Sequence, residues 1–167
     1  MSGRIIAFEP VAPSGARTLI LGSMPSVESL NQGFYYAHPR NAFWRILAQV
    51  YGEPFPEDIP ARIALLERHD LALWDVLASC ERRGSLDSAI RQPVPNDFGA
   101  LFRRCQGIRR ILLNGGTAHR LFMKWGKSFI EGRECLRMPS TSPAYTLQYE
   151  RKLAQWRQAL KYEHESL

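Results

Sequence analysis

Short apolar runs alternate along the chain with segments in which apolar residues recur at the period of a helix. The runs cover residues 18–21, 71–77, 108–113 and 136–138. Runs this short, with apolar residues at almost every position, are typical of strands buried on both faces of a parallel sheet. Because strands that alternate with helices form α/β folds, we predict a three-layer α/β/α sandwich around a central, mostly parallel four-stranded sheet.

The helical segments cover residues 42–50, 59–68, 97–104, 118–125 and 146–162. Asn41 stands where the cap of the first helix is expected, because an Asn side chain can accept a hydrogen bond from a free N–H of the first turn. Residues 1–17 are predicted to form an irregular or edge segment, and 82–95 a polar surface loop with a short turn of helix. At 167 residues, the chain is expected to form one domain, 1–167.

Composition points weakly to a partner and argues against several kinds of site. The net charge of +6 favours a polyanionic partner such as nucleic acid. No apolar run approaches the ~18–20 residues of a membrane span, and the start of the chain lacks the apolar core of a secretory signal. Cys80, Cys105 and Cys135 are widely spaced, which suits free thiols in a reducing compartment. We therefore expect a cytoplasmic protein without membrane contact, metal or cofactor.

Polar segments follow three of the predicted strands, each at the carboxyl end of its strand. They begin at Gly22, Asn114 and Ser140. The carboxyl ends of parallel strands lie at one edge of the sheet, where ligands bind in open α/β folds, so these segments should converge on one pocket. The candidate substrate contacts among them are Gly22, Ser23, Met24, Pro25, Ser140, Thr141, Ser142 and Pro143.

Two asparagines, Asn41 and Asn114, are the candidate catalytic residues. A neutral amide can position a water molecule and stabilise positive charge on a sugar, although it is a feeble base. Asn114 ends a predicted buried strand, and its amide offers a donor and an acceptor to the edge of a purine. Each also has an ordinary structural explanation, Asn41 as a helix cap and Asn114 as part of an Asn-Gly turn.

The stretch FYYAHPRNAFW at residues 34–44 resembles motif 1 of the uracil-DNA glycosylase superfamily, and is close to that of mismatch-specific uracil-DNA glycosylases. Those enzymes carry their catalytic Asn in a G-x-N-P-G turn, where this chain has Met24 in Gly-Ser-Met-Pro-Ser. Together, the two stretches are similar to the hypoxanthine-DNA glycosylase family, whose members remove deaminated adenine from DNA. The strand ending at Asn114 and the late Pro-Ser-Thr-Ser-Pro belong to the resemblance, which thus covers much of the chain.

The resemblance implies a monofunctional enzyme of base excision repair that hydrolyses the N-glycosidic bond of a deaminated base, hypoxanthine above all. It implies double- or single-stranded DNA as the partner, and we expect a monomer. Tyr36 would stack on a flipped base, and residues 139–143 would act as motif 2 and enter the minor groove. His38 is a further candidate substrate contact, although a His before Pro is more often a hydrogen-bonded structural residue.

Two other functions stay open from the sequence. One is a uracil or broad-range glycosylase of the same superfamily, acting on uracil and xanthine, and the other is a non-catalytic nucleic-acid-binding module on this fold. The chain has no P-loop, no G-x-G-x-x-G and no H-E-x-x-H motif, which argues against phosphate-loop, dinucleotide and zinc-protease sites. Residues 139–143 have the composition of an ordinary strand-to-helix turn as well.

Overall fold

The computed structural model describes residues 3–165 and contains a central sheet of four parallel strands. In spatial order, the strands are β3 (Leu71–Asp75), β2 (Thr18–Gly22), β6 (Arg110–Asn114) and β7 (Glu134–Met138). Every residue of β2, β3 and β6 is buried, as expected for apolar runs that are covered on both faces. The predicted parallel four-stranded sheet is confirmed.

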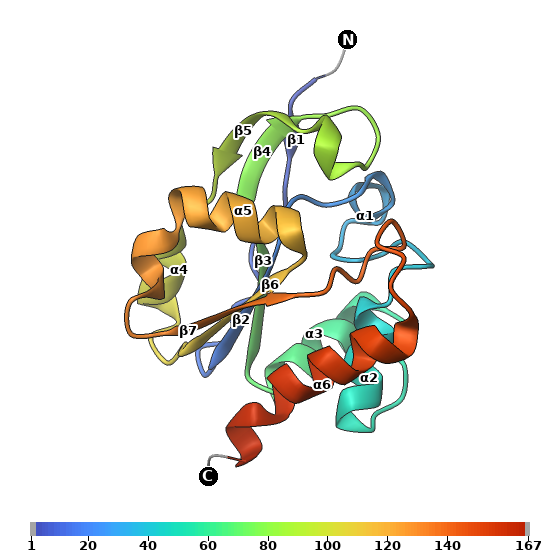
Figure 1. The fold of residues 1–167 in the computed structure, drawn as a ribbon, viewed down its shortest axis with the longest axis vertical. Coiled ribbons are helices and arrows are strands. Elements are labelled where there is room, and N and C mark those ends of the chain that lie inside the picture. Colours follow the sequence, from blue (N-terminus) through green and yellow to red (C-terminus); the bar gives the residue numbers. More distant parts are fainter. Residues whose placement is uncertain (1–2, 166–167) are drawn as a thin grey trace.

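Helices cover both faces of this sheet (Figure 1). On one face lie α2 (Phe43–Tyr51), α3 (Ile59–Arg68) and α6 (Tyr149–Glu165), and on the other α4 (Phe98–Arg104) and α5 (Gly116–Trp125). Large aromatic side chains fill the layers between, with Phe43, Trp44 and Trp156 all but fully buried. The predicted three-layer α/β/α arrangement is therefore confirmed.

A second, antiparallel sheet was not predicted. The apolar run at 71–77 is not one strand, because β3 ends at Asp75 and the chain continues into β4 (Leu77–Glu81). Strand β4 pairs with β1 (Ile5–Ile6) and β5 (Arg91–Pro95) in the order β1-β4-β5. The prediction of a loop at 82–95 is wrong for β5, whose two prolines and largely exposed residues mark an edge strand without an alternating apolar pattern.

Local contacts set the ends of the helices. The Oγ of Ser26 caps α1 (Val27–Gln32), a helix absent from the predictions, by accepting the N–H of Ser29 at 3.1 Å. The cap position of α2 is taken by Ala42, not Asn41, yet Asn41 Oδ1 accepts the N–H of Phe43 at 3.0 Å. Asn41 therefore satisfies a free donor of the first turn from one residue farther out than expected. Two short 3₁₀ helices, η1 (Asp87–Ala89) and η2 (Lys127–Ile130), complete the elements.

Across residues 3–165, no helix joins sufficient length to sufficient hydropathy to cross a bilayer.

Candidate active site

The carboxyl ends of β2, β3 and β6 and the segment after β7 surround one cavity of about 610 Å³. This volume lies within the usual range of small-molecule sites. Ten of the residues predicted from the sequence line it, namely Gly22, Ser23, Met24, Pro25, Tyr36, Asn41, Asn114, Ser140, Thr141 and Ser142.

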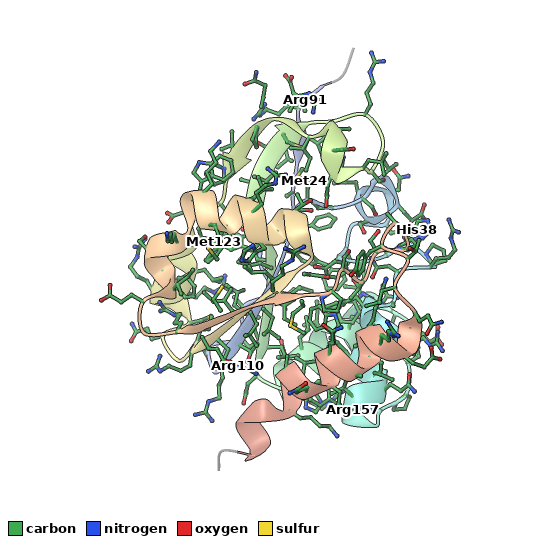
Figure 2. All side chains as sticks on the ribbon, in the orientation of Figure 1. Met24, His38, Arg91, Arg110, Met123 and Arg157 are labelled. Atoms are coloured by element: carbon green, nitrogen blue, oxygen red, sulfur yellow. The ribbon has the colours of Figure 1, made fainter. Side chains whose placement is uncertain are left out.

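His38 and Pro143 do not line this cavity. They line a second cavity of about 620 Å³, which shares Tyr36, Asn41, Thr141 and Tyr145 with the first. His38 Nδ1 accepts the N–H of Arg40 at 3.1 Å, which is a local contact within the loop between α1 and α2. Figure 2 shows His38 far out on that loop, well away from Met24. The structure thus places the amides of Asn41 and Asn114 and the strand ends around the first cavity. His38 and Pro143 line only the second cavity.

The turn after β2 is held tightly against its neighbours. Ser23 Oγ donates a hydrogen bond to Asp87 Oδ1 at 2.8 Å, and the carbonyl of Pro25 accepts one from the Arg82 guanidinium. The Met24 side chain is buried and belongs to the hydrophobic core while also reaching the cavity wall. Met24 is thus an apolar residue of the cavity wall, and the polar groups of the cavity come from other residues.

Asn114 and Thr141 form a two-bond clamp between β6 and the segment after β7. Asn114 Nδ2 donates to Thr141 Oγ1 at 3.0 Å, and Asn114 Oδ1 accepts the N–H of Thr141 at 3.0 Å. The carbonyl of Thr141 in turn accepts the N–H of Ala42 at 3.0 Å, next to Asn41. Both ends of the Asn114 amide are therefore engaged with protein, so this side chain positions the segment after β7 and the start of α2.

Gly115 allows the clamp to close. Its φ is +102°, and a Cβ at this position would lie 3.0 Å from the Cβ of Ser140. A side chain here would meet both a strained backbone and the neighbouring segment. The pair Asn114-Gly115, which the sequence also allowed as an ordinary turn, is thus the point where the end of β6 meets the segment after β7.

Tyr36 stands between the two cavities in an unusual conformation. Its φ of 53° lies in the left-handed region, which a bulky residue adopts only when its surroundings enforce it. The ring packs on Phe43 with centroids 4.2 Å apart. The hydroxyl is buried and makes no hydrogen bond of normal geometry within the described residues, although the Asn114 side chain lies close enough to act on it and lower its pKa. Burial, followed by the charge of Asp75, raises the pKa of the phenol well above its usual value, so the ring stays neutral.

Asp75, at the end of β3, is one of the cavity residues that the sequence analysis did not single out. It is 3% exposed, and Oδ2 of its carboxyl group has no partner among residues 3–165. Burial raises the pKa of this carboxyl to about 7, the charge of Asp87 acts in the same direction, and Arg82 opposes both. An aspartate inside an otherwise apolar run was the available signal, but the run was interpreted as one strand through Leu77.

Cations lie at the rim of the cavity. Arg120 of α5 and Arg137 of β7 are exposed there, next to His119. A Cβ on Gly116 would lie 2.8 Å from the Arg137 Nη2 atom, so the guanidinium sits directly over the start of α5. Among the side chains that the structure describes, in residues 3–161, no three from His, Cys, Asp or Glu form a group that could hold a metal ion. The site therefore combines amides, hydroxyls and one carboxyl group with a basic rim.

Comparison with known proteins identifies the family. The family model described as the Uracil DNA glycosylase superfamily matches residues 9–163. This chain belongs to the uracil DNA glycosylase superfamily. The family predicted from residues 34–44 is thereby confirmed, and as a superfamily member the chain is a DNA glycosylase, a hydrolase that cleaves N-glycosyl bonds in DNA.

Relatives of this glycosylase share both sequence and fold. The Hypoxanthine DNA glycosylase of Methanosarcina barkeri is 35% identical over 109 residues, which are 65% of this chain and 69% of the relative. That of Methanosarcina acetivorans is 36% identical over 112 residues, 66% of this chain and 71% of the relative. A solution NMR structure of a candidate uracil DNA glycosylase from Methanosarcina acetivorans superposes with a TM-score of 0.82 at 30% identity, covering 96% of this chain and 98% of that one.

Proposed function

We propose that this glycosylase removes hypoxanthine from DNA by hydrolysing the bond between the base and deoxyribose. The observation that supports it best is the chain of contacts that runs from Asn114 through Thr141 to Ala42 and orients Asn41 at the cavity. The names of the two curated relatives support hypoxanthine as the base. The substrate is a flipped nucleotide in double- or single-stranded DNA, bound by a monomer.

The proposed reaction places the sugar near Asn41 and the base deeper in the cavity, toward Gly22. As the C1′–N9 bond breaks, its electron pair leaves with the base and the sugar passes through an oxocarbenium-like state. Water then bonds to C1′ through its oxygen, and the proton that it loses is taken up, through solvent, by the departing base. The Asn41 carbonyl, held by its bond to the Phe43 N–H, orients the water that attacks C1′ and stabilises the positive charge. Arg120 and Arg137 contact phosphates at the rim.

A monofunctional reaction fits the composition of the cavity wall. Among the described residues that line the cavity there is no lysine, so no amine stands ready to attack C1′ and form a Schiff base. Water is then the nucleophile, and the product is an intact strand with an abasic site. Strand cleavage should follow only after treatment with alkali.

The test measures release of free base from inosine-, xanthine- and uracil-containing strands under single-turnover conditions with saturating enzyme. We expect hypoxanthine to be released fastest, with strand breaks only after alkali. Faster release of uracil would support the second candidate, a uracil or broad-range enzyme, which the similarity to the candidate uracil DNA glycosylase favours. If all three strands bind and no base is released, the protein is instead a non-catalytic nucleic-acid-binding module.

A further inference from the structure

The second cavity, which His38 and Pro143 line, has no role in the proposed reaction. It lies between the loop before α2, the loop before α3 and the start of α6 (Figure 1). Its volume of about 620 Å³ is sufficient for a ligand of the size of one nucleotide. Five aromatic side chains line it together with four basic ones, and among the described residues no carboxylate does. The wall is therefore built for an anion that carries a flat apolar group.

The basic and aromatic side chains of this wall alternate in space. The Arg45 Cζ atom lies 3.8 Å from the centre of the Tyr149 ring, and the Lys152 Nζ atom lies 5.4 Å from that of Tyr145. Positive charge set against ring faces is the composition of sites that bind single-stranded nucleic acid, because bases stack on the rings while phosphates contact the cations.

Two of the rings are open to a ligand. Phe55 is 45% exposed and Tyr145 is 48% exposed, whereas Trp44 of the same wall is 1% exposed and belongs to the core. The Arg62 guanidinium carbon lies 5.9 Å from the centre of the Phe55 ring, so a positive charge stands near this exposed ring as well. Phe55 and Tyr145 therefore offer apolar surface that the protein itself does not cover.

Lys152 brings a buried positive charge to the cavity. Its side chain is buried, with the residue 5% exposed. Among the described residues its ammonium group donates to one acceptor, the carbonyl oxygen of Ser142 at 3.0 Å, and pairs with no carboxylate. Burial lowers the pKa of Lys152, which reflects the unfavourable free energy of a buried charge without a counter-ion. An anion in the cavity would supply that counter-ion.

We propose that the second cavity binds the nucleotide next to the flipped one on the same DNA strand. Its base stacks on the exposed rings of Phe55 and Tyr145, and its phosphate pairs with Lys152. This inference rests on the proposed function, because the flipped nucleotide occupies the first cavity. The two cavities share Tyr36 and Asn41, so adjacent nucleotides of one strand can fill both.

The state of the DNA determines when this site is used. A base enters the second cavity only after it has left its own stack and pair, which is unfavourable in a duplex and nearly free in a single strand. Stacking on a ring tolerates any base, because every base has a π-face. The second cavity should therefore add affinity for single strands of any sequence around the lesion.

The first test needs no variant and measures equilibrium binding to single strands. Each strand carries one 2′-fluoroarabino inosine, since fluorine suppresses the oxocarbenium-like state and keeps the glycosidic bond intact. A tetrahydrofuran spacer, which lacks a base, replaces the nucleotide on its 5′ or its 3′ side. We expect one of these two strands to bind about five- to a hundredfold more weakly than the strand without a spacer. A spacer three nucleotides away is the control and should change nothing. Unchanged binding with the spacer on either side would overturn the inference.

A variant of Phe55 locates the effect in the second cavity. Phe55→Leu keeps an apolar side chain without a ring, so it should bind the strand without a spacer about fivefold more weakly and lose most of the spacer effect. The matched control is Val94→Ala on β5, a residue that is also 45% exposed but lines neither cavity. If Phe55→Leu has a native circular dichroism spectrum and keeps the full spacer effect, the neighbouring base binds elsewhere and the inference is wrong.

A variant of Lys152 tests the phosphate contact. Lys152→Met should reduce the slope of log affinity against log salt by about 0.7, the value for one phosphate of a single strand. The matched control, Lys161→Met, removes an exposed lysine of the same helix that lines neither cavity, and should leave the slope unchanged. A lysine that only supports the Ser142 carbonyl would weaken binding equally at every salt concentration, and that result would remove the phosphate from the second cavity.

Release of hypoxanthine separates this inference from the proposed function. It is measured in parallel with the wild type on single strands that carry ordinary deoxyinosine. Absence of release would overturn the proposed function, whatever the spacers do to binding. Release together with binding that no neighbouring spacer affects would overturn only the role of the second cavity.

Discussion

At the scale of single residues, Asn41 is the group on which hydrolysis should depend most directly. We expect Asn41→Ala to slow base release by at least about a hundredfold, because a fixed dipole beside the developing positive charge is lost. Binding to DNA should change little, since the rim and motif 2 are untouched. Single-turnover release with saturating enzyme measures the first effect, and fluorescence anisotropy measures the second. Release near the wild-type rate would remove Asn41 from the mechanism.

The buried carboxyl group of Asp75 should also affect stability. Its pKa in the folded protein, about 7, lies above the ~3.9 of an unfolded aspartate, so the folded state holds the proton more tightly. The wild type should therefore lose stability as pH rises from about 4 to about 7. Asp75→Asn has no proton to lose, so its free energy of unfolding should exceed that of the wild type by about 1–4 kcal/mol at about pH 8. Urea unfolding of both proteins at several pH values tests this, and a difference that does not change with pH would contradict it.

At the scale of elements, the clamp of Asn114 and Thr141 ties β6 to the segment after β7. Asn114→Ala leaves the buried N–H of Thr141 without a partner, which should cost about 1–3 kcal/mol of stability. Thr141→Val leaves one N–H of the Asn114 amide without its acceptor but keeps the bond from the Thr141 N–H to Asn114 Oδ1, so it should cost less, about 1 kcal/mol. Base release should decrease in both variants, because Ala42 and Asn41 are fixed through the same segment. Urea unfolding measures the loss of stability in each variant, and single-turnover release measures the loss of activity. Equal losses of stability in the two variants would show that the bond to the Thr141 hydroxyl accounts for the whole contribution of the clamp.

The elements that build the cavity were largely predictable from apolar patterning. Buried parallel strands read as uninterrupted apolar runs, so the exits at Gly22 and Asn114 could be located and their convergence inferred. The exit at Asp75 could not, because the next residues belong to a second sheet and continue the apolar run. Strand β5 carries no recognisable pattern, since an exposed edge with two prolines buries little of its length.

The direction in which side chains point could not be predicted from the pattern of apolar and polar residues. The sequence places His38 and Asn41 three residues apart in one polar loop, yet only Asn41 reaches the first cavity. That outcome depends on the left-handed backbone at Tyr36 and on the turn in which Asn41 N–H donates to the carbonyl of His38. Likewise, residue type alone could not tell whether the amide of Asn114 would face a ligand or Thr141, because both satisfy its donor and acceptor.

At the scale of the whole molecule, the excess of positive charge should govern affinity for DNA. Binding should weaken as salt increases, because each neutralised phosphate releases counterions. Arg137→Gln should reduce the slope of log affinity against log salt by about one, equally for inosine-containing and ordinary DNA. The matched control is Arg157→Gln on α6, which removes the same charge from a residue that does not line the cavity (Figure 2). If the two variants have the same slope of log affinity against log salt, the net charge of the protein sets its affinity for DNA, and the arginines at the rim of the cavity do not.

The strand order β3-β2-β6-β7 also has a consequence for how the enzyme folds. Thr18 pairs with Leu71 on one side and with Arg110 on the other, so the central strand waits for partners that are synthesised much later. Parallel pairings between distant segments form slowly, since the loops must close before contacts compensate for the lost entropy. The cavity is closed by the segment after β7, so a chain that ends before this strand lacks Ser140, Thr141 and Ser142 of the cavity wall. Glycosylase activity should therefore return during refolding only together with the native sheet, which keeps incomplete chains from acting on DNA.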